Sequence, residues 1–245
     1  MTRSANGTAV TVWSPEDDDD EDEFLAALLA SAHAIAGCER VADALPRIAE
    51  GAVAVVPGVH DVGVAVRVAG ELSCAAHTTE TAAAVDRAQI GMAEGPCLDA
   101  IAGADTVVLL DAATETRWPR FVPEAVRHGV RASLSVRLAT AGPAAALNLH
   151  LTQHALGDRS TRLRTRRRAQ LLAVYASLAL ARSDRVEKLE RAVVRRDVIG
   201  QAKGILMRHD GLDAEEAFER LRSASQTTNT KLYDVAAWLA ARGAP

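Results

Sequence analysis

Three apolar stripes at helical spacing run through residues 194–241, VVRRDVIGQAKGILMRHDGLDAEEAFERLRSASQTTNTKLYDVAAWLA. The stripes comprise Ile199, Ala202, Ile205 and Leu206, then Ala214, Ala217, Phe218 and Leu221, then Leu232, Val235, Ala236 and Leu239. Gly211 stands where a helix C-terminus favours glycine, and Asp213 stands where an N-cap is expected, with Glu216 three residues on. The pattern predicts three packed helices, the second of which ends in the polar run 225–230.

Among the side chains outside these stripes is a set that is basic or carries amides and hydroxyls. They come from all three helices and from the turn before the third, and we predict them as an RNA-binding set: Arg195, Arg196, Gln201, Lys203, Arg222, Ser225, Gln226, Asn229 and Lys231. Such groups suit phosphates and base edges. The alternative is an ordinary solvated surface, which is the usual fate of lysine and arginine. Because about 48 residues is near the lower limit for an independent core, we also expect a dimer.

Three runs in this stretch, RRDVIGQAKGILM (195–207), EEAFERLRSAS (215–225) and NTKLYDVAAWLA (229–240), closely resemble the ANTAR domain. ANTAR domains are the RNA-binding modules of transcription antitermination regulators, and residues 194–245 are assigned to one. The resemblance implies that a homodimer recognises paired RNA stem-loops in a nascent transcript and prevents terminator formation. Within the predicted set, Lys203, Arg222, Ser225, Asn229 and Lys231 are our first choices for RNA contact, because they are polar and lie off the apolar stripes.

Composition bounds the class of protein. With 245 residues, of which 49% are hydrophobic, the chain can bury a sizeable core and has room for two domains. The three cysteines, Cys38, Cys74 and Cys97, lie far apart without a CxxC motif, which disfavours a disulfide framework and a zinc site and favours a reducing cytoplasm. No signal-peptide pattern and no apolar run of roughly 18 residues are found. We expect a soluble cytoplasmic protein with no metal site and no catalytic centre.

Residues 1–23 are predicted to form a disordered acidic tail. The run EDDDDEDE at 16–23 places eight acids in succession, and such closely spaced like charges repel one another. Once these eight charges are removed from the net charge of −4, the remaining chain carries about +4, which is compatible with nucleic-acid binding. The tail has two interpretations: an electrostatic decoy for a basic surface, or a solubilising arm.

Strand and helix signals alternate in the middle of the chain. Two helices are expected between Glu23 and about Val56, and the runs DVGVAVRV and ELSCAAHT predict a β-hairpin that turns at Ala69 and Gly70. Further strands are expected at 106–111, 132–139 and 146–153, with helices at about 80–91, 96–102 and 119–128. Five strands with interspersed helices, followed by a long helix, predict an α+β domain on an antiparallel sheet.

Two elements of this region, EGPCLDAI (94–101) and the run 111–121 that ends in RWPRF, resemble the GAF domains that precede ANTAR modules in two-domain regulators. The resemblance covers roughly residues 25–182, and we assign residues 24–182 to a GAF sensor domain. GAF domains as a class bind small molecules or chromophores between the sheet and its covering segments, or serve as dimer platforms. The resemblance leaves room for a small-molecule effector but names none, and no cofactor is assigned.

Cys97 has two interpretations. Gly95 and Pro96 place it near a helix start, where amide dipoles lower a thiol pKa and would make it reactive. More commonly such a cysteine is a small buried hydrophobe. His150 and His154 have the i, i+4 spacing of helical metal ligands, but in a strand these positions stand roughly 13 Å apart, so metal binding is not expected.

A long helix is expected to join the domains, since no proline or glycine occurs from 160 to 199. Residues 160–193 are assigned to this connecting helix. A seven-residue repeat gives weak support for a short parallel coiled coil, through Leu172, Ala179, Val186 and Val193, with Tyr175 and Leu189 at a second seam that Arg182 and Arg196 interrupt. The arginine-rich run 157–168 either extends RNA contact through phosphates or solvates a helix face.

The sequence therefore predicts a GAF and ANTAR domain-containing transcription antitermination regulator and not an enzyme. In this hypothesis the GAF domain senses an effector and the ANTAR dimer captures paired hairpins. The first alternative is a GAF-based ligand or redox sensor that uses Cys97. In that case the helical C-terminus would act as a dimerisation module or as a DNA-binding module, as three-helix units often do.

Overall fold

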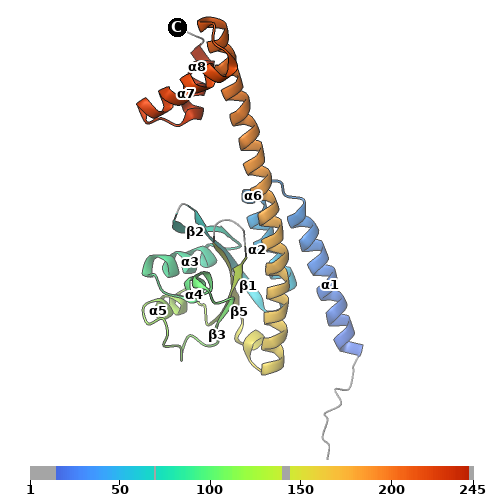
Figure 1. Ribbon diagram of the computed structural model, residues 1–245. Coiled ribbons are helices and arrows are strands. Elements are labelled where there is room, and N and C mark those ends of the chain that lie inside the picture. Colours follow the sequence, from blue (N-terminus) through green and yellow to red (C-terminus); the bar gives the residue numbers. More distant parts are fainter. Residues whose placement is uncertain (1–14, 69, 140–143, 243–245) are drawn as a thin grey trace, which may run out of the picture. The chain divides into compact units, whose positions relative to one another are not determined.

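The computed structural model describes residues 15–68, 70–139 and 144–242 (Figure 1). Contacts divide the chain into two compact units, residues 1–183 and 184–245, which are described separately below. Residues 1–14 of the predicted acidic tail and Ala69 of the predicted hairpin turn lie outside the described residues.

The N-terminal unit is built on one five-stranded antiparallel sheet with the strand order β2-β1-β5-β4-β3. The strands are β1 (Val59–Val68), β2 (Glu71–His77), β3 (Thr106–Leu109), β4 (Ala132–Leu138) and β5 (Ala145–Leu151). All seven residues of the central strand β5 are buried, because helices cover both faces of the sheet. The predicted α+β class and the predicted hairpin are confirmed.

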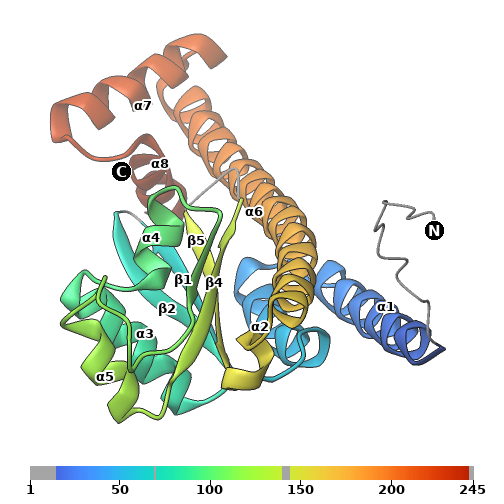
Figure 2. The same cartoon turned by 90° about the horizontal axis from the view of Figure 1, so that it is seen from below.

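One face of the sheet is covered by α2 (Val41–Val55) and the first part of α6 (Arg159–Asp210), and α1 (Pro15–Ala36) packs against α2 on the outside, as Figures 1 and 2 show. The sheet contributes alternate residues such as Val62, Val64 and Val66 of β1, since side chains of a strand point to opposite faces in turn. A short 3₁₀ helix, η1 (Gln153–Leu156), leads from β5 to α6. The largest apolar core of the unit lies between these layers.

The opposite face is covered by α3 (Glu80–Met92), α4 (Pro96–Ala102) and α5 (Phe121–Arg127). Trp118 and Phe121 are almost fully buried here, and the Trp118 indole Nε1 donates a hydrogen bond to Asp99 Oδ2 at 3.1 Å. Cys97 packs with Ala65 and Ala146, so it is a buried side chain of α4.

The acidic run differs from its prediction as a disordered tail, because helix α1 begins at Pro15 and already includes it. Asp20 Oδ2 lies 3.1 Å from Arg164 Nη1 and 2.8 Å from Arg168 Nη2, so two arginines of α6 offset part of the acidic charge. The Arg168 guanidinium also lies 4.6 Å from the centre of the Phe24 ring. Acidic residues in the first turns of a helix also favour its N-terminal dipole.

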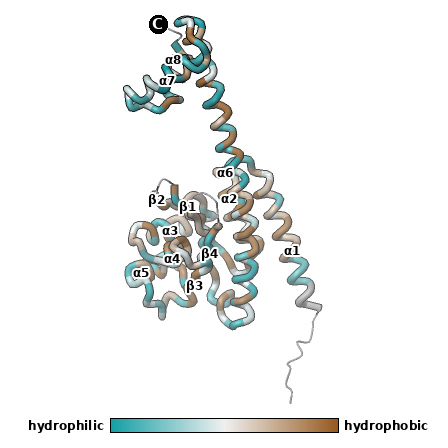
Figure 3. Tube along the Cα trace, viewed as in Figure 1, coloured by the Kyte–Doolittle hydropathy of each residue, from teal (hydrophilic) through white to brown (hydrophobic). Residues whose placement is uncertain are grey.

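In the N-terminal unit, the residues of the predicted heptad pattern do not all face a coiled-coil partner. Leu172, the first residue of the predicted seam, is fully buried against the sheet, and a 3.6-residue period replaces the heptad in this part of α6. The buried face comprises Ala169, Leu172, Ala173, Ala176 and Leu180. Hydrophobic and hydrophilic residues alternate along the whole of α6 (Figure 3). Within a single chain, therefore, Leu172 stabilises the fold of its own unit.

The C-terminal unit consists of the part of α6 from Asp184 onward, α7 (Ala214–Thr228) and α8 (Leu232–Arg242). A small core holds the three helices together through Ala202, Leu221, Ala236 and Leu239. These residues belong to the three apolar stripes, so the predicted three-helix packing is confirmed. Gly211 has φ +70°, as a residue that ends a helix in the left-handed region should.

Helix α7 begins with a capping box. Asp213 Oδ1 accepts hydrogen bonds from the backbone N–H groups of Glu215 and Glu216, and Glu216 Oε2 accepts one from the Asp213 N–H. We expect Asp213→Ala to lower the free energy of unfolding of this unit by about 1 kcal/mol, whereas Asp213→Asn should cost much less because asparagine also caps well. Urea unfolding followed by circular dichroism measures this difference, and equal losses in the two variants would contradict it.

None of the described helices is long and apolar enough to cross a membrane.

Candidate nucleic-acid interface

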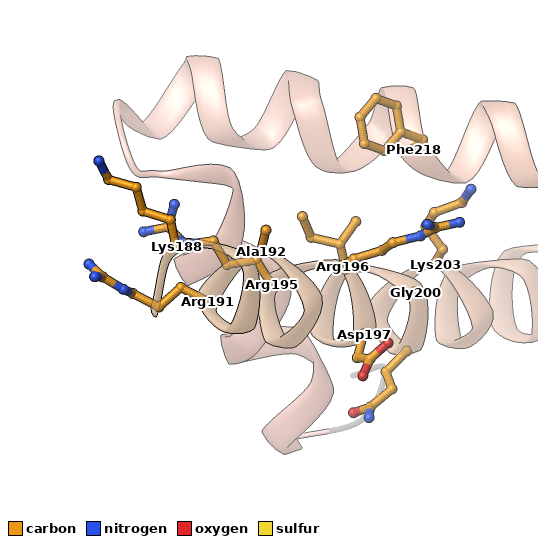
Figure 4. A pocket seen from close by; sticks show the side chains of 11 residues that line it. Lys188, Arg191, Ala192, Arg195, Arg196, Asp197, Gly200, Lys203 and Phe218 are labelled. Carbon is orange, nitrogen blue, oxygen red and sulfur yellow. The ribbon is translucent and has the colours of Figure 1, made fainter. Parts of the chain in front are cut away.

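A basic groove in the C-terminal unit, here called groove one, runs along α6 and is closed on one side by Phe218 of α7 (Figure 4). Its volume is about 900 Å³. Lys188, Arg191, Arg195 and Ile199 recur every three or four positions and therefore share one helix face. The lining comprises Lys188, Arg191, Ala192, Arg195, Arg196, Asp197, Ile199, Gly200, Gln201, Lys203 and Phe218.

The cations of groove one fall into two groups. Lys188 Nζ lies 2.6 Å from Asp184 Oδ2, and Arg191 Nη2 lies 2.9 Å from Glu187 Oε2, so both form ion pairs along the helix. In the described part of the chain, Arg195, Arg196 and Lys203 have no ion-pair partner. The Lys203 ammonium lies 5.8 Å from the centre of the Phe218 ring. These three cations can therefore bind an external anion without breaking an ion pair inside the protein.

A second groove, here called groove two, lies between α6 and the start of α8 and has a volume of about 890 Å³. It is lined by Glu190, Arg191, Val194, Arg195, Ile199, Lys231, Leu232, Tyr233 and Asp234. Arg191, Arg195 and Ile199 line both grooves, so the two share a wall of α6.

The structure brings together five of the nine predicted RNA-binding residues. Four of them line groove one and two line groove two, with Arg195 in both; these five are Arg195, Arg196, Gln201, Lys203 and Lys231. The other four line neither groove and lie on α7 or at its end: Arg222, Ser225, Gln226 and Asn229. The prediction that they bind RNA remains a prediction.

Three of these four residues have local structural roles. Arg222 Nη2 lies 3.2 Å from Glu219 Oε2. The Ser225 hydroxyl donates a hydrogen bond of 2.6 Å to the Thr230 carbonyl, and Asn229 ends α7 with φ +49°, a conformation that asparagine tolerates. Polar character alone did not separate such capping groups from groups that are free to bind a ligand.

Sequence reasoning missed three groove residues, Lys188, Arg191 and Tyr233. The first two were assigned to the connecting helix, because the domain was predicted to begin at residue 194. The spacing of 188, 191 and 195 on one helix face was the signal that could have placed them with Arg195.

The N-terminal unit holds a buried polar cluster on the sheet face beneath α3. Asp86 of α3 accepts hydrogen bonds at Oδ1 from Asn148 Nδ2 (2.8 Å) and Gln89 Nε2 (3.2 Å), while Ser135 Oγ donates to Asn148 Oδ1. Gln89 Oε1 in turn accepts from the backbone N–H of Cys97 at 2.9 Å. Gly63 of β1 lies directly below, where a Cβ would stand 2.1 Å from Asp86 Oδ2.

Burial sets the protonation of this cluster. Desolvation raises the pKa of Asp86 to about 7 and lowers the pKa of the fully buried His150 to about 4. Asp86 Oδ2, both ring nitrogens of His150 and Ser133 Oγ are buried and find no hydrogen-bond partner within the described residues. Burial and the neighbouring Asp86 raise the pKa of Cys74 to about 12, and burial also raises the pKa of the Cys97 thiol.

The two units thus define a protein with an α+β domain and a three-helix domain that carries a groove lined by cations. Residues 187–239 match the family model of the ANTAR domain, and this part of the chain is an ANTAR domain. The match begins seven residues before the predicted boundary at 194 and so includes Lys188 and Arg191. No curated protein matches the chain.

Several solved structures share the fold at low sequence identity. The bacteriophytochrome RpBphP3 from R. palustris is 10% identical with a TM-score of 0.55, over 88% of this chain and 47% of that one. The N-acylhomoserine lactone dependent LuxR family transcription factor CepR2 from Burkholderia cenocepacia is 20% identical with a TM-score of 0.52, over 64% of this chain and 94% of that one. The chain spans about half the length of the phytochrome. These similarities agree with the GAF plus ANTAR architecture that the sequence predicted.

Proposed function

We propose that the protein is an RNA-binding transcription antitermination regulator, in which a GAF sensor domain controls an ANTAR domain. The observation that supports this most is the set of unpaired cations in groove one, because Arg195, Arg196 and Lys203 line the same groove within the ANTAR domain. Captured RNA hairpins would then be unavailable for the terminator. No bond is made or broken, so the protein acts as a regulator and not as an enzyme.

Groove one suits the backbone of an RNA stem. Phosphates of a duplex lie along its outer edges, and a row of cations on one helix face can follow them. Duplex RNA hides base edges in its deep major groove, so sequence is read mostly in single-stranded loops. We therefore assign stem contact to the cations of groove one and expect binding that falls steeply as salt is added.

The regulator is proposed to act as a homodimer, which would present two ANTAR domains to two hairpins. An exposed apolar stripe on the first part of α6 supports this proposal. It comprises Leu171, Val174, Tyr175 and Leu178, at the i, i+3, i+4, i+7 spacing of one helix face, with exposed fractions of 42 to 66%. Such a stripe on a helix favours burial against a second copy.

The buried polar cluster supports the proposal that the GAF domain takes a small-molecule effector. Unpartnered polar atoms of Asp86, His150 and Ser133 are costly in a dry interior, and a polar ligand would offset that cost. Binding that favours one dimer arrangement by a few kcal/mol would then control the ANTAR domain. We propose a cytoplasmic location, in keeping with the three free cysteines.

The proposed function is tested by salt-titrated binding of the full chain to three nucleic acids: RNA with two short hairpins, RNA with one hairpin, and duplex DNA. We expect preference for the paired hairpins. Preference for duplex DNA would instead support the DNA-binding alternative, and equal weak binding to all three would leave only non-specific attraction to phosphates.

The redox alternative makes a different prediction for Cys97. Because burial raises its pKa, the thiol stays protonated at pH 8 and reacts slowly. We expect iodoacetamide to modify the less buried Cys38 first in the native protein, and Cys97 only after unfolding. Mass spectrometry of tryptic peptides measures both rates. Faster modification of Cys97 than of Cys38 at pH 8 would restore the redox hypothesis.

A further inference from the structure

Groove two differs from groove one in chemistry. Its walls are apolar and aromatic, formed by Val194, Ile199, Leu232 and the ring of Tyr233. Val194 is 54% exposed, although a valine gains by burial. The Tyr233 hydroxyl has no hydrogen-bond partner among the described residues, and its side chain is only partly buried, so part of the ring is open to a ligand. These walls suit a flat group with apolar faces.

The rim of groove two carries cations that can hold a phosphate on either side of such a group. Arg195 comes from α6 and Lys231 from the turn before α8, and neither has an ion-pair partner within the described ranges. A phosphate backbone that crosses the groove would meet one cation on each side. This arrangement distinguishes groove two from a purely apolar docking surface for protein.

Two carboxylates complete the groove, Glu190 of α6 and Asp234 of α8. Neither is paired with a cation in the described part of the chain, and both would repel the closely spaced phosphates of a stem. A carboxylate only accepts hydrogen bonds, so it favours the amino groups on the edges of unpaired bases. Groove one, by contrast, has one acid, Asp197, among eleven lining residues.

We infer that groove two binds one unstacked nucleotide of an RNA loop, whose base stacks on Tyr233 while Arg195 and Lys231 hold its flanking phosphates. This inference rests on the proposed function and assigns it a second subsite: groove one holds the stem, and groove two reads the loop. Asp234 or Glu190 accepts from the amino group of the base, which favours adenine, cytosine or guanine over uracil. Base stacking on an aromatic ring contributes enough to matter for affinity.

The test combines protein variants with RNA variants, using the full chain and RNA with two hairpins. Tyr233→Leu keeps an apolar side chain but removes the ring, and Tyr233→Phe keeps the ring. Trp238→Leu is the matched control, because Trp238 is an exposed aromatic of the same helix that lines neither groove. Each protein is titrated with the intact RNA and with RNAs that carry a single abasic site at each loop position in turn.

We expect Tyr233→Leu to weaken binding of the intact RNA by about 10-fold, a loss that corresponds to one base stack, while Tyr233→Phe and Trp238→Leu stay within about 3-fold of wild type. One abasic position should weaken wild type to the same extent and cost Tyr233→Leu nothing further. At that position uracil should bind more weakly than the amino-bearing bases.

Several outcomes would overturn the inference. If Tyr233→Leu binds the intact RNA with wild-type affinity, no loop base stacks on Tyr233. The same conclusion follows if, at every loop position, the affinity lost through Tyr233→Leu and the affinity lost through the abasic site are fully additive. A changed oligomeric state of the free variant in sedimentation would assign the groove to a second copy of the chain. These results leave the proposed function standing, whereas failure of wild type to prefer the paired hairpins would reject both. If Tyr233→Leu fails to fold, the inference is tested by comparing how wild type and Tyr233→Phe bind the series of abasic RNAs.

Discussion

An Arg195→Gln/Lys203→Gln double variant should bind the paired-hairpin RNA on the order of 30-fold more weakly than wild type near physiological salt. Both cations line groove one without an internal ion-pair partner among the described residues, so the substitutions remove phosphate contacts without leaving a buried acid unpaired. The slope of log affinity against log salt should also fall by roughly 2, because two fewer phosphates are neutralised. Fluorescence anisotropy at several salt concentrations measures both quantities.

The matched control is Arg208→Gln/Arg220→Gln, which removes the same charge from exposed positions that line neither groove. We expect this control to lose less than about 3-fold and to keep most of the salt slope. An equal loss in both double variants would mean that the general charge of the domain, and not groove one, attracts RNA.

Asp86→Asn should change the stability of the N-terminal unit in a pH-dependent way. The folded-state pKa of Asp86 is raised from 3.8 to about 7, so the protonated carboxyl is favoured by folding. Its contribution to stability is fully present below about pH 4 and is lost as the pH rises through about 7. We expect wild type to lose a few kcal/mol of unfolding free energy between pH 4 and pH 8, and Asp86→Asn to remove most of that dependence.

The measurement is urea unfolding at each pH, followed by the fluorescence of the buried Trp118 in a background where Trp13 and Trp238 are phenylalanine. Asp43→Asn, an exposed acid on α2, is the matched control and should leave the pH dependence unchanged. A wild-type profile that is flat between pH 4 and pH 8 would show that Asp86 remains ionised with an ordinary pKa. His150 contributes in the opposite sense, since its lowered pKa makes it destabilising as the pH falls from 6.5 through 4.

Local sequence signals predicted the C-terminal unit well because the ends of its helices are determined by residues close to one another in the sequence. Gly211 and Asp213 act through their own backbone and the next few residues, and both positions behave as predicted. Ser225 and Asn229 were predicted to contact RNA because they are polar and lie off the apolar stripes. Their polar groups looked free in the sequence but serve the end of α7 and its turn.

Features that depend on tertiary contacts were not predictable in the same way. The acidic run is helical in a structure where Asp20 meets Arg164 and Arg168, which lie more than 140 residues away along the chain. Asp86 sits in an α3 sequence that gives no sign of burial, and only the packing of α3 on β1 removes its carboxyl from water. Hydrophobic periodicity reports which face a helix buries, but it does not report which polar groups that face encloses.

The close approach of Gly63 to Asp86 constrains the order in which these two positions can change during evolution. A side chain at residue 63 would place its Cβ 2.1 Å from a buried carboxylate oxygen, so alanine there would force the Asp86 side chain out of its packed position. A shorter residue at 86 relieves the overlap and makes the second substitution accessible. Lineages that lose the buried carboxyl can therefore go on to acquire side chains at 63, whereas lineages that keep it must retain glycine.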